Sequence, residues 1–394
     1  MSDGSAASHV DEPIALDLLA AATAGAIELV WVDGGFSPRR LSQRALVSRA
    51  DENIRLISGV ATGVRLRLMT AATRIDLDLS IRTRVLEQTV TASPPSIAVE
   101  TQGALVDRVE SDTFGRRWPD ASGEIHESGT ARSVVRLSPG GDGLTERPVT
   151  VWLPHDAEVI IHGATADAPA RVAPADPRPR WLHHGSSISH ALEAPGPFGP
   201  WPQRVARDLD LNLSNLSFAG QAVLDQSVAQ TIAAHPADLI TLKLGINVIN
   251  CDGFSVRTFG PAMHGFLDTI RRSQPDTAIV LITAIACPIH ENTPGPTIAG
   301  PDGKAMALPR ERSDRDGRLT LAATRRLIES AVRARGDERL FLLDGLSLFG
   351  QADAHLLRDN LHPNLEGNDL IGERFVALAR DPGSPLGRAL SHAG

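Results

Sequence analysis

The sequence predicts an α/β domain with a parallel sheet, preceded by a β-rich domain. In the first part of the chain, apolar residues alternate with polar ones. In the second part, short apolar runs alternate with longer helical stretches, and a Pro-rich segment separates the two patterns. A chain of 394 residues is also longer than most single domains. We therefore expect a first domain at 1–168, a linker at 169–179 and a second domain at 180–394.

The first domain has the periodicity of strands with one buried face. Val64, Leu66 and Leu68 alternate with polar residues, and residues 75–81 repeat the same period of two. Further strands are expected at 27–32, 97–99, 134–137, 149–153 and 159–161. Turn residues such as Gly34-Gly35, which follows the first of them, separate the expected strands. Several short strands of this kind predict a β-sandwich that is jelly-roll-like.

The second domain begins after a linker stiffened by four prolines, Pro169, Pro174, Pro177 and Pro179. Strands are expected at 180–184, 211–218, 239–244, 278–284 and 340–344, and helices at 200–209, 222–234, 256–273, 319–334 and 365–379. Strands separated by helices imply a parallel sheet with helices on both faces. The segment 288–315 is rich in Pro, Gly and charge, so it is either a functional loop over the site or a disordered insert.

Four short fragments carry the chemistry of the second domain. The first, Gly185-Ser186-Ser187-Ile188-Ser189, follows a hydrophobic stretch and places a serine at a strand-to-helix turn, where its hydroxyl and its N–H are both accessible. The other three are 217–221 (Ser-Phe-Ala-Gly-Gln), 244–247 (Leu-Gly-Ile-Asn) and 359–364 (Asp-Asn-Leu-His-Pro-Asn). Each borders an apolar run, so each can lie at the carboxyl edge of a parallel sheet, where such proteins bind ligands.

In this order the fragments resemble the four blocks of the SGNH, or GDSL, hydrolase superfamily. Those blocks supply a nucleophilic Ser, a Gly, an Asn, and a His with an Asp three residues before it. The resemblance covers about residues 178 to 385 and implies a flavodoxin-like SGNH α/β/α sandwich.

The residue types support the same chemistry when considered alone. His362 would take the proton of Ser187 as general base and return it to the leaving group, while Asp359 fixes the imidazole tautomer. The N–H groups of Ser187 and Gly220, with the side-chain amide of Asn247, would form an oxyanion hole.

Two departures from the family pattern and three other histidines leave alternatives open. Ser186 stands where the family usually has Asp, so Ser186 is a rival nucleophile, and Val248 stands where an Asp usually follows the Asn. His355 is a rival base, as are His183 and His184, which are better explained as packing residues.

Composition narrows the function classes. The formal net charge is −8 without a basic block, which argues against nucleic-acid binding. The N-terminus lacks the positive region of a secretory signal, and acidic residues interrupt the apolar run 14–31, so we expect a cytoplasmic protein without a membrane span. No metal-binding motif occurs, and the two cysteines form no CxxC or disulfide framework. We expect no metal and no cofactor, with acyl-CoA as a candidate donor substrate.

These residues predict acyl transfer through an acyl-enzyme, which water would convert into esterase activity and a bound alcohol into acyltransferase activity. The two-domain arrangement resembles two groups: carbohydrate acetyl esterases with an N-terminal jelly roll, and the GDSL salicylyl acyltransferase of tetracycline biosynthesis. We favour the second group. The expected reaction moves an acyl group, with a salicylyl-like aromatic group as a candidate, from a thioester donor to a hydroxyl of a small-molecule natural product. The alternative is an intracellular carboxylesterase or carbohydrate acetyl esterase. A binding module with a decayed triad is a third hypothesis, which the intact Ser187, Asp359 and His362 oppose.

Overall fold

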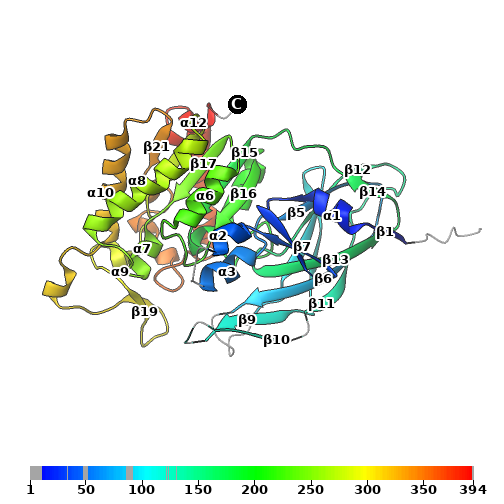
Figure 1. The fold of residues 1–394 in the computed structure, drawn as a ribbon, viewed down its shortest axis with the longest axis horizontal. Helices are drawn as coiled ribbons and strands as arrows, with labels where there is room; N and C mark the ends of the chain where they lie inside the picture. Colours follow the sequence, from blue (N-terminus) through cyan, green and yellow to red (C-terminus); the bar gives the residue numbers. More distant parts are fainter. Residues whose placement is uncertain are drawn as a thin grey trace, which may run out of the picture. The chain divides into compact units, whose positions relative to one another are not determined.

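The protein, here a computed structural model, is described over residues 11–32, 34–47, 52–85, 92–120, 122, 124–129 and 131–392. The chain divides into two compact units (Figure 1). The first comprises the residues up to Arg39 together with Gly59–Ala175, and the second comprises Arg40–Ser58 together with the chain from Asp176 onward.

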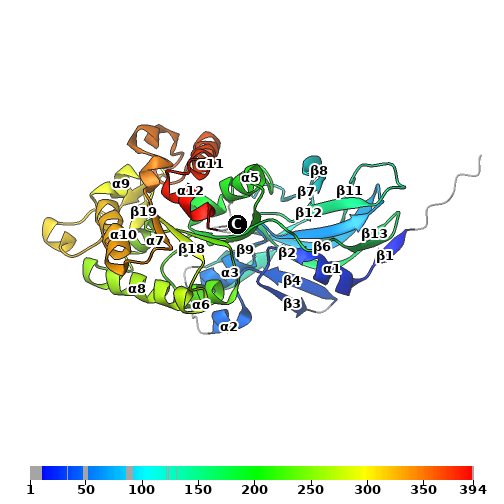
Figure 2. The ribbon, with the colours of Figure 1, turned by 90° about the horizontal axis from the view of Figure 1, so that it is seen from above.

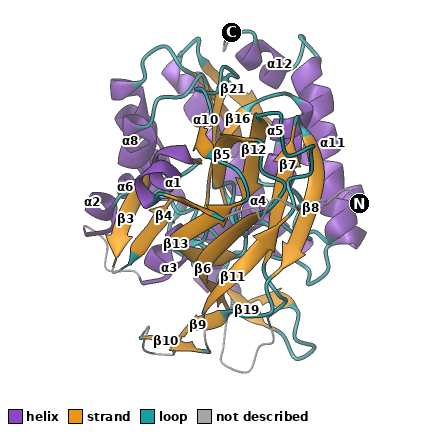
Figure 3. Ribbon diagram, turned by 90° about the vertical axis from the view of Figure 1, so that its right-hand side faces the viewer, coloured by secondary structure: helices purple, strands orange, loops and turns teal. Residues whose placement is uncertain are grey.

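Two sheets form the first unit (Figure 3). The larger contains β1 (Glu12–Ile14), β3 (Glu28–Val32), β4 (Gly35–Arg39), β6 (Ile75–Arg84), β9 (Gly115–Pro119), β10 (Ile125–Ser128), β11 (Arg132–Leu137) and β13 (Ala157–Ala166). The smaller contains β2 (Thr23–Ala24), β5 (Arg65–Thr70), β7 (Ser96–Thr101), β8 (Ala104–Glu110), β12 (Arg147–Trp152) and β14 (Ala170–Val172). Within the described chain, all of these strands pair antiparallel except β6 with β9, and helix α1 (Leu16–Ala22) lies against β5, β13 and β14.

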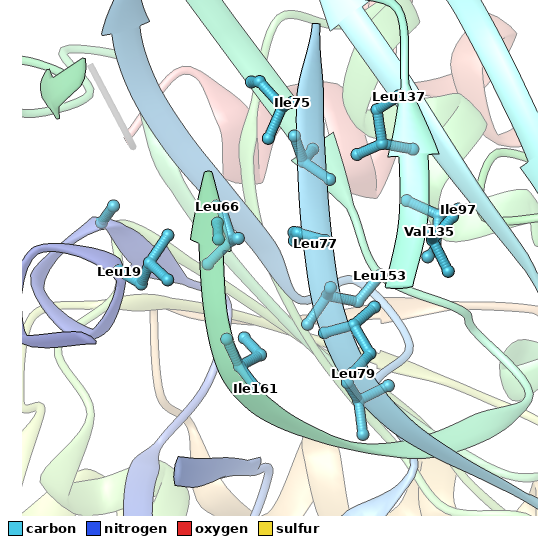
Figure 4. Packing of buried hydrophobic residues seen from close by; sticks show 14 of the residues in the cluster. Leu19, Leu66, Ile75, Leu77, Leu79, Ile97, Val135, Leu137, Leu153 and Ile161 are labelled. Atoms are coloured by element: carbon cyan, nitrogen blue, oxygen red, sulfur yellow. The ribbon is translucent and has the colours of Figure 1, made fainter. Parts of the chain in front are cut away.

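The core of the first unit draws on both sheets (Figure 4). Leu77 and Leu79 of β6 and Leu66 of β5 are fully buried, and so is Ile97 of β7. Their neighbours along the strands, such as Arg67, are more exposed, as expected from the period of two. The expected β-sandwich is therefore confirmed as a strand-rich domain.

One five-stranded parallel sheet forms the centre of the second unit. Its strands lie in the order β16 (Asn212–Ser217), β15 (Arg180–Gly185), β17 (Leu239–Lys243), β18 (Ala278–Ile282) and β21 (Leu340–Leu343). Every residue of β17 and β18 is buried, which requires cover on both faces. In chain order this is the 2-1-3-4-5 arrangement of flavodoxin-like folds. The predicted α/β class and parallel sheet are confirmed.

Helices cover both faces of this sheet (Figure 2). α5 (Trp201–Asp208), α11 (Leu365–Arg380) and α12 (Pro385–Leu390) lie on one face, and α6 (Gln226–Ala234), α8 (Val256–Ser273) and α10 (Leu321–Arg335) on the other. On the first face, Trp181 of β15 packs against Trp201 and Phe375, with ring centroids 6.3 and 5.4 Å away. On the second face, α8 begins at a capping box formed by Ser255 and Thr258, which satisfies the first N–H groups of the helix.

The expected division at 1–168, 169–179 and 180–394 needs correction in two places. β14 lies inside the stretch expected as a linker but pairs with β5, so the first unit extends to Ala175. Residues 40–58 leave the β-sandwich and belong to the second unit, where α2 (Gln43–Val47) lies against α6. This excursion also carries most of α3 (Glu52–Gly59). Local sequence pattern does not reveal it, because its contacts are with residues far along the chain.

Arg40 attaches the excursion to the sheet. Its side chain is fully buried, and its guanidinium donates hydrogen bonds to the carbonyls of Asn215 and Ser217 at 3.2 and 2.6 Å, and to that of Ile57. The same group lies over the ring of Phe218, 4.9 Å from its centroid. Burial lowers the pKa of Arg40 to about 9, which leaves the group cationic at neutral pH. Arg40 therefore fixes the carboxyl end of β16 through hydrogen bonds to its last carbonyl groups.

Replacing Arg40 tests this role. Arg40→Met leaves buried carbonyl oxygens without donors, so the free energy of unfolding of the second unit should fall by about 3 kcal/mol or more. Arg44→Met is the matched control, since Arg44 is exposed on the same excursion and should change the free energy by less than about 0.5 kcal/mol. Urea denaturation monitored by tryptophan fluorescence measures both. Equal unfolding free energies for the two variants would contradict the role of Arg40.

Candidate active site

The predicted nucleophile lies at the switch point of the sheet, directly after β15. Ser187 is the first residue of α4 (Ser187–His190), and Ser186 is its N-cap, with a side-chain oxygen that accepts the N–H of Ile188 at 3.3 Å. A Cβ on Gly185 would lie only 2.6 Å from Oγ of Ser189, so a larger residue before the turn would displace that side chain. Ser186 is 1% exposed, whereas Ser187 is half-buried and open to a substrate.

A chain of hydrogen bonds joins Ser187 to a histidine and a carboxylate. Oγ of Ser187 lies 2.9 Å from Nε2 of His362, and Nδ1 of that ring lies 2.8 Å from Oδ2 of Asp359. The structure thus brings together the three residues that the sequence predicted as a triad. Ser186, the rival nucleophile, is instead occupied as a helix cap, which is the hydrogen-bonding role that an Asp at this position would also fill.

Asp359 and His362 are held on one tight turn. Oδ1 of Asp359 accepts the N–H groups of Leu361 and His362 at 3.0 and 2.6 Å, and Asn360 adopts the left-handed conformation with φ of 68°. Partial burial raises the pKa of Asp359, but the hydrogen bonds from the side chain and backbone of His362 lower it by more, so the pKa lies well below its usual range. The group stays a carboxylate and can stabilise an imidazolium.

Three candidate donors for an oxyanion have free hydrogens. Within the described part of the chain, the N–H groups of Ser187 and Gly220 have no hydrogen-bond partner, and Gly220 has φ of 76°, which favours glycine. Asn247 lies on α7 (Ile246–Asn250), where its Oδ1 accepts the N–H of Ala222 at 3.0 Å. This bond fixes the amide orientation and leaves Nδ2 available to donate. Ser187, Gly220 and Asn247 remain our predicted oxyanion hole.

The other histidines have different environments. His355 is exposed and bonds a carbonyl within its own short helix, η3 (Gln351–Leu356). His183 and His184 are buried in β15, where Nδ1 of His183 lies 2.7 Å from Oγ1 of Thr241. Burial lowers the pKa of His184 to about 4 and the pKa of His183 well below its ordinary value. Both are therefore neutral packing residues, as expected, and the serine is bonded to His362.

The segment 288–315 forms hydrogen bonds with the turn that carries Asp359 and His362, a contact that the sequence did not predict. It contains α9 (Pro288–Glu291), the strands β19 (Thr297–Ala299) and β20 (Ala305–Ala307), and a short helix, η1 (Arg312–Arg315). The N–H of Ala305 donates to the carbonyl of Asp359 at 3.0 Å, and Nδ2 of Asn360 donates to the carbonyl of Ala305 at 3.2 Å. These contacts fit the expectation of a functional loop better than that of a disordered insert.

One group of residues in the first unit has side chains close enough together to hold a metal ion. Asp120, Glu124 and His126, near the turn between β9 and β10 of the first unit, have ligand atoms within 4.8 Å of one another in the described chain. Asp120 and Glu124 are exposed, and Oδ1 of Asp120 already accepts the N–H groups of Ser122 and Glu124. These bonds shape the turn.

Comparisons with known proteins agree with this geometry. Residues 184–370 match the GDSL-like Lipase/Acylhydrolase family. The structure resembles SsfX3, a salicylyl-acyltransferase from a tetracycline biosynthetic pathway, with 24% identity, a TM-score of 0.76, and coverage of 94% of this chain and 98% of that one. A search of curated proteins found no match.

Two carbohydrate esterases share the fold at lower similarity. A family two carbohydrate esterase from Clostridium thermocellum, solved with cellohexaose, has 13% identity and a TM-score of 0.54, with 81% of this chain and 92% of that chain covered. The acetyl xylan esterase Est2A from Butyrivibrio proteoclasticus has 13% identity and a TM-score of 0.51, with 83% and 92% covered.

These matches confirm the expected fold. Residues 184–370 match the model of a GDSL-like lipase and acylhydrolase family, and the fold, with its N-terminal strand-rich domain, is shared with the salicylyl-acyltransferase. None of the described helices combines the length and the hydropathy that a membrane crossing requires.

Labelling with a fluorophosphonate tests the nucleophile. We expect one adduct on Ser187 by intact-mass and peptide spectrometry, because its Oγ is bonded to His362. Ser187→Ala should abolish the adduct. Ser186→Ala should retain it and lower stability by about 1 kcal/mol through loss of the cap. An adduct on Ser186, or labelling that survives Ser187→Ala, would refute the assignment.

The pH dependence of labelling tests the acid–base pair. The rate of labelling should be lower in acid, because a protonated imidazole cannot accept the serine proton. Asp359 should add no titration near neutral pH, since its pKa lies well below its usual range. Asp359→Asn should slow labelling by about 10²- to 10⁴-fold, whereas Glu373→Gln, an exposed change on α11, should not. A rate that is independent of pH would contradict His362 as the base.

Proposed function

We propose that the protein is an O-acyltransferase that moves an acyl group from a thioester donor through Ser187 to a hydroxyl of a small-molecule natural product. The observation that supports an acyl-enzyme is the hydrogen-bonded chain of Ser187, His362 and Asp359. The fold that both units share with a salicylyl-acyltransferase favours transfer over hydrolysis. An aromatic acyl group is therefore the first candidate.

The first half-reaction forms the acyl-enzyme. The hydroxyl of Ser187 gives its proton to Nε2 of His362 while Oγ attacks the thioester carbonyl carbon. The resulting oxyanion accepts hydrogen bonds from the N–H groups of Ser187 and Gly220 and from the Asn247 amide, and each such donor is typically worth about 10²- to 10³-fold in turnover. The C–S bond then breaks, and the departing thiolate leaves as a thiol with the proton from His362.

The second half-reaction reverses the proton movements. An acceptor hydroxyl gives its proton to neutral His362 and attacks the ester carbonyl of acylated Ser187. The Ser187 Oγ–C bond breaks, His362 returns the proton to Oγ, and the acceptor leaves as an ester. Asp359 stabilises the imidazolium in both halves. A cytoplasmic setting, where acyl-CoA is at hand, belongs to this proposal, and both partners are small molecules rather than nucleic acid or membrane.

The second candidate is a carboxylesterase or carbohydrate acetyl esterase, in which water replaces the acceptor. The observation that favours it is the shared fold of the carbohydrate esterases, which covers about four fifths of this chain. The triad serves both reactions equally, so the outcome depends on what reaches the acyl-enzyme.

Partition of the acyl-enzyme distinguishes the two. With p-nitrophenyl acetate or a salicylyl thioester as donor, we expect slow release of p-nitrophenol or thiol in water and at least a tenfold acceleration by the right alcohol, as positioned acceptors react far faster than free ones. Mass spectrometry identifies the ester product. Fast hydrolysis of acetyl esters with no transfer to any alcohol would support the esterase instead.

A further inference from the structure

The segment 288–315 contacts two parts of the predicted active site that are far apart in the sequence. After β18, the chain forms α9 and then the antiparallel hairpin of β19 and β20. One strand of this hairpin is bonded to α7, which carries the predicted oxyanion donor Asn247. The other strand is bonded to the turn that carries Asp359 and His362.

The strand β20 and the residue before α9 hold the outer side of the acid–base turn. The N–H of Ala305 donates to the carbonyl of Asp359 at 3.0 Å, and Nδ2 of Asn360 donates to the carbonyl of Ala305 at 3.2 Å. Sγ of Cys287, the N-cap residue of α9, donates to the carbonyl of Asn360 at 3.5 Å. Asn360 is therefore bonded to this part of the chain through both its side chain and its backbone.

The tip of the turn, residues 359–362, has few other attachments. In the described chain, the hydrogen bonds that it makes with other segments are the three with Cys287 and Ala305 and the one between Ser187 and His362. The bond to Ser187 is the one along which the proton moves. The other three are therefore the hydrogen bonds from elsewhere in the chain that can hold His362 in place while its proton is transferred.

The first strand of the hairpin is attached to α7. Oγ1 of Thr297 lies 2.9 Å from Oδ1 of Asn250, the last residue of α7, and 2.7 Å from Nε2 of the buried His290. A Cβ on Gly295 would overlap the carbonyl oxygen of Ile249, so the backbone before β19 lies directly against the same helix.

An ion pair adds to this attachment. Arg310, which follows β20, donates from Nε to the carbonyl of Gly295 at 2.9 Å and from Nη2 to Oδ2 of Asp252 at 2.9 Å. Asp252 lies two residues beyond the end of α7, and the two side chains of the pair are only 16 and 17% exposed. Salt screens partly buried pairs less than exposed ones. The chain on both sides of the hairpin is therefore bonded near the end of α7.

We propose that the β19–β20 hairpin is a positioning element of the active site, which fixes His362 relative to Asn247, with Thr297 and Asn360 as positioning residues. The base and the oxyanion donor must act on one reacting group at the same moment. A displacement of about 1 Å can lower the rate about 10²-fold. This inference rests on the proposed acyl transfer and adds the element that maintains the geometry for it.

Thr297→Val tests the connection without changing a residue that touches the turn. Valine keeps the shape of threonine but loses the hydroxyl that bonds Asn250 and His290. Amide exchange in peptides covering 359–362, measured by mass spectrometry, should become about five- to tenfold faster. Thr297→Ser keeps the hydroxyl and should exchange like the parent, as should Thr269→Val, a matched loss of a bonded hydroxyl on α8. Unchanged exchange in Thr297→Val would overturn the proposal.

Fluorophosphonate labelling shows whether the hairpin serves catalysis. Thr297→Val and Asn360→Gly should each lower the maximal rate constant for labelling Ser187 by about tenfold. The reagent concentration that gives the half-maximal rate should stay the same, because geometry rather than binding is disturbed. Glycine adopts the φ of 68° at position 360 without strain, so Asn360→Gly removes the amide and keeps the turn. Thr297→Ser should label like the parent.

The double variant distinguishes one shared constraint from two local effects. Losing either end of the hairpin releases the same constraint, so Thr297→Val combined with Asn360→Gly should be slower than the slower single variant by less than about threefold. Independent effects would multiply to about 100-fold, which would contradict the proposal. If the parent is not labelled at Ser187, the proposed function fails, whereas the exchange result can still hold. If every variant labels like the parent, the hairpin proposal alone fails.

Discussion

The hydrogen bond between Ser187 and His362 joins two residues 175 positions apart, so the site exists only when the whole sheet has formed. Ser187 follows the inner strand β15, whereas His362 follows the edge strand β21, with β17 and β18 between them. The chain must therefore return across the sheet. It does so between β21 and His362, through η2 (Gly345–Ser347) and η3. The helix that follows His362, α11, is held against the start of α5, where Asn368 accepts the N–H of Trp201 at 3.3 Å and donates to the carbonyl of Gly199 at 2.8 Å.

The oxyanion side of the site depends on a different long-range contact. Arg40 comes from the excursion between two strands of the β-sandwich, yet its guanidinium holds the last carbonyls of β16 and lies over Phe218. Gly220 is two residues further on. A buried arginine with several carbonyl acceptors has one geometry available, because each N–H direction is fixed by the planar group. The first half of the chain therefore contributes to the conformation of the segment that carries Gly220.

The sequence was sufficient for those features that depend on local pattern. The period of two located the sandwich strands, and the four short blocks located Ser187, Gly220, Asn247 and His362, because strand ends of a parallel sheet meet at one edge. It was insufficient for contacts between distant segments. The excursion 40–58 has a helical pattern that says nothing of its partner, and the bond from Ala305 to Asp359 depends on the path of the 288–315 segment. The capping role of Ser186 also needed the geometry, since two adjacent serines are equivalent in the sequence.

Water and an acceptor alcohol compete for the acyl-enzyme, because the side chains of the triad are partly exposed to solvent. The side chain of His362 is 27% exposed, and Ser187 is half-buried, so burial alone does not exclude water from the base. An acceptor bound next to Ser187 has an effective concentration of about 10⁵ M or more, against about 55 M for water. Transfer can therefore exceed hydrolysis in an open site, provided that the acceptor is held in place. Under that condition, the groups that position an acceptor, rather than the triad, decide between the two reactions.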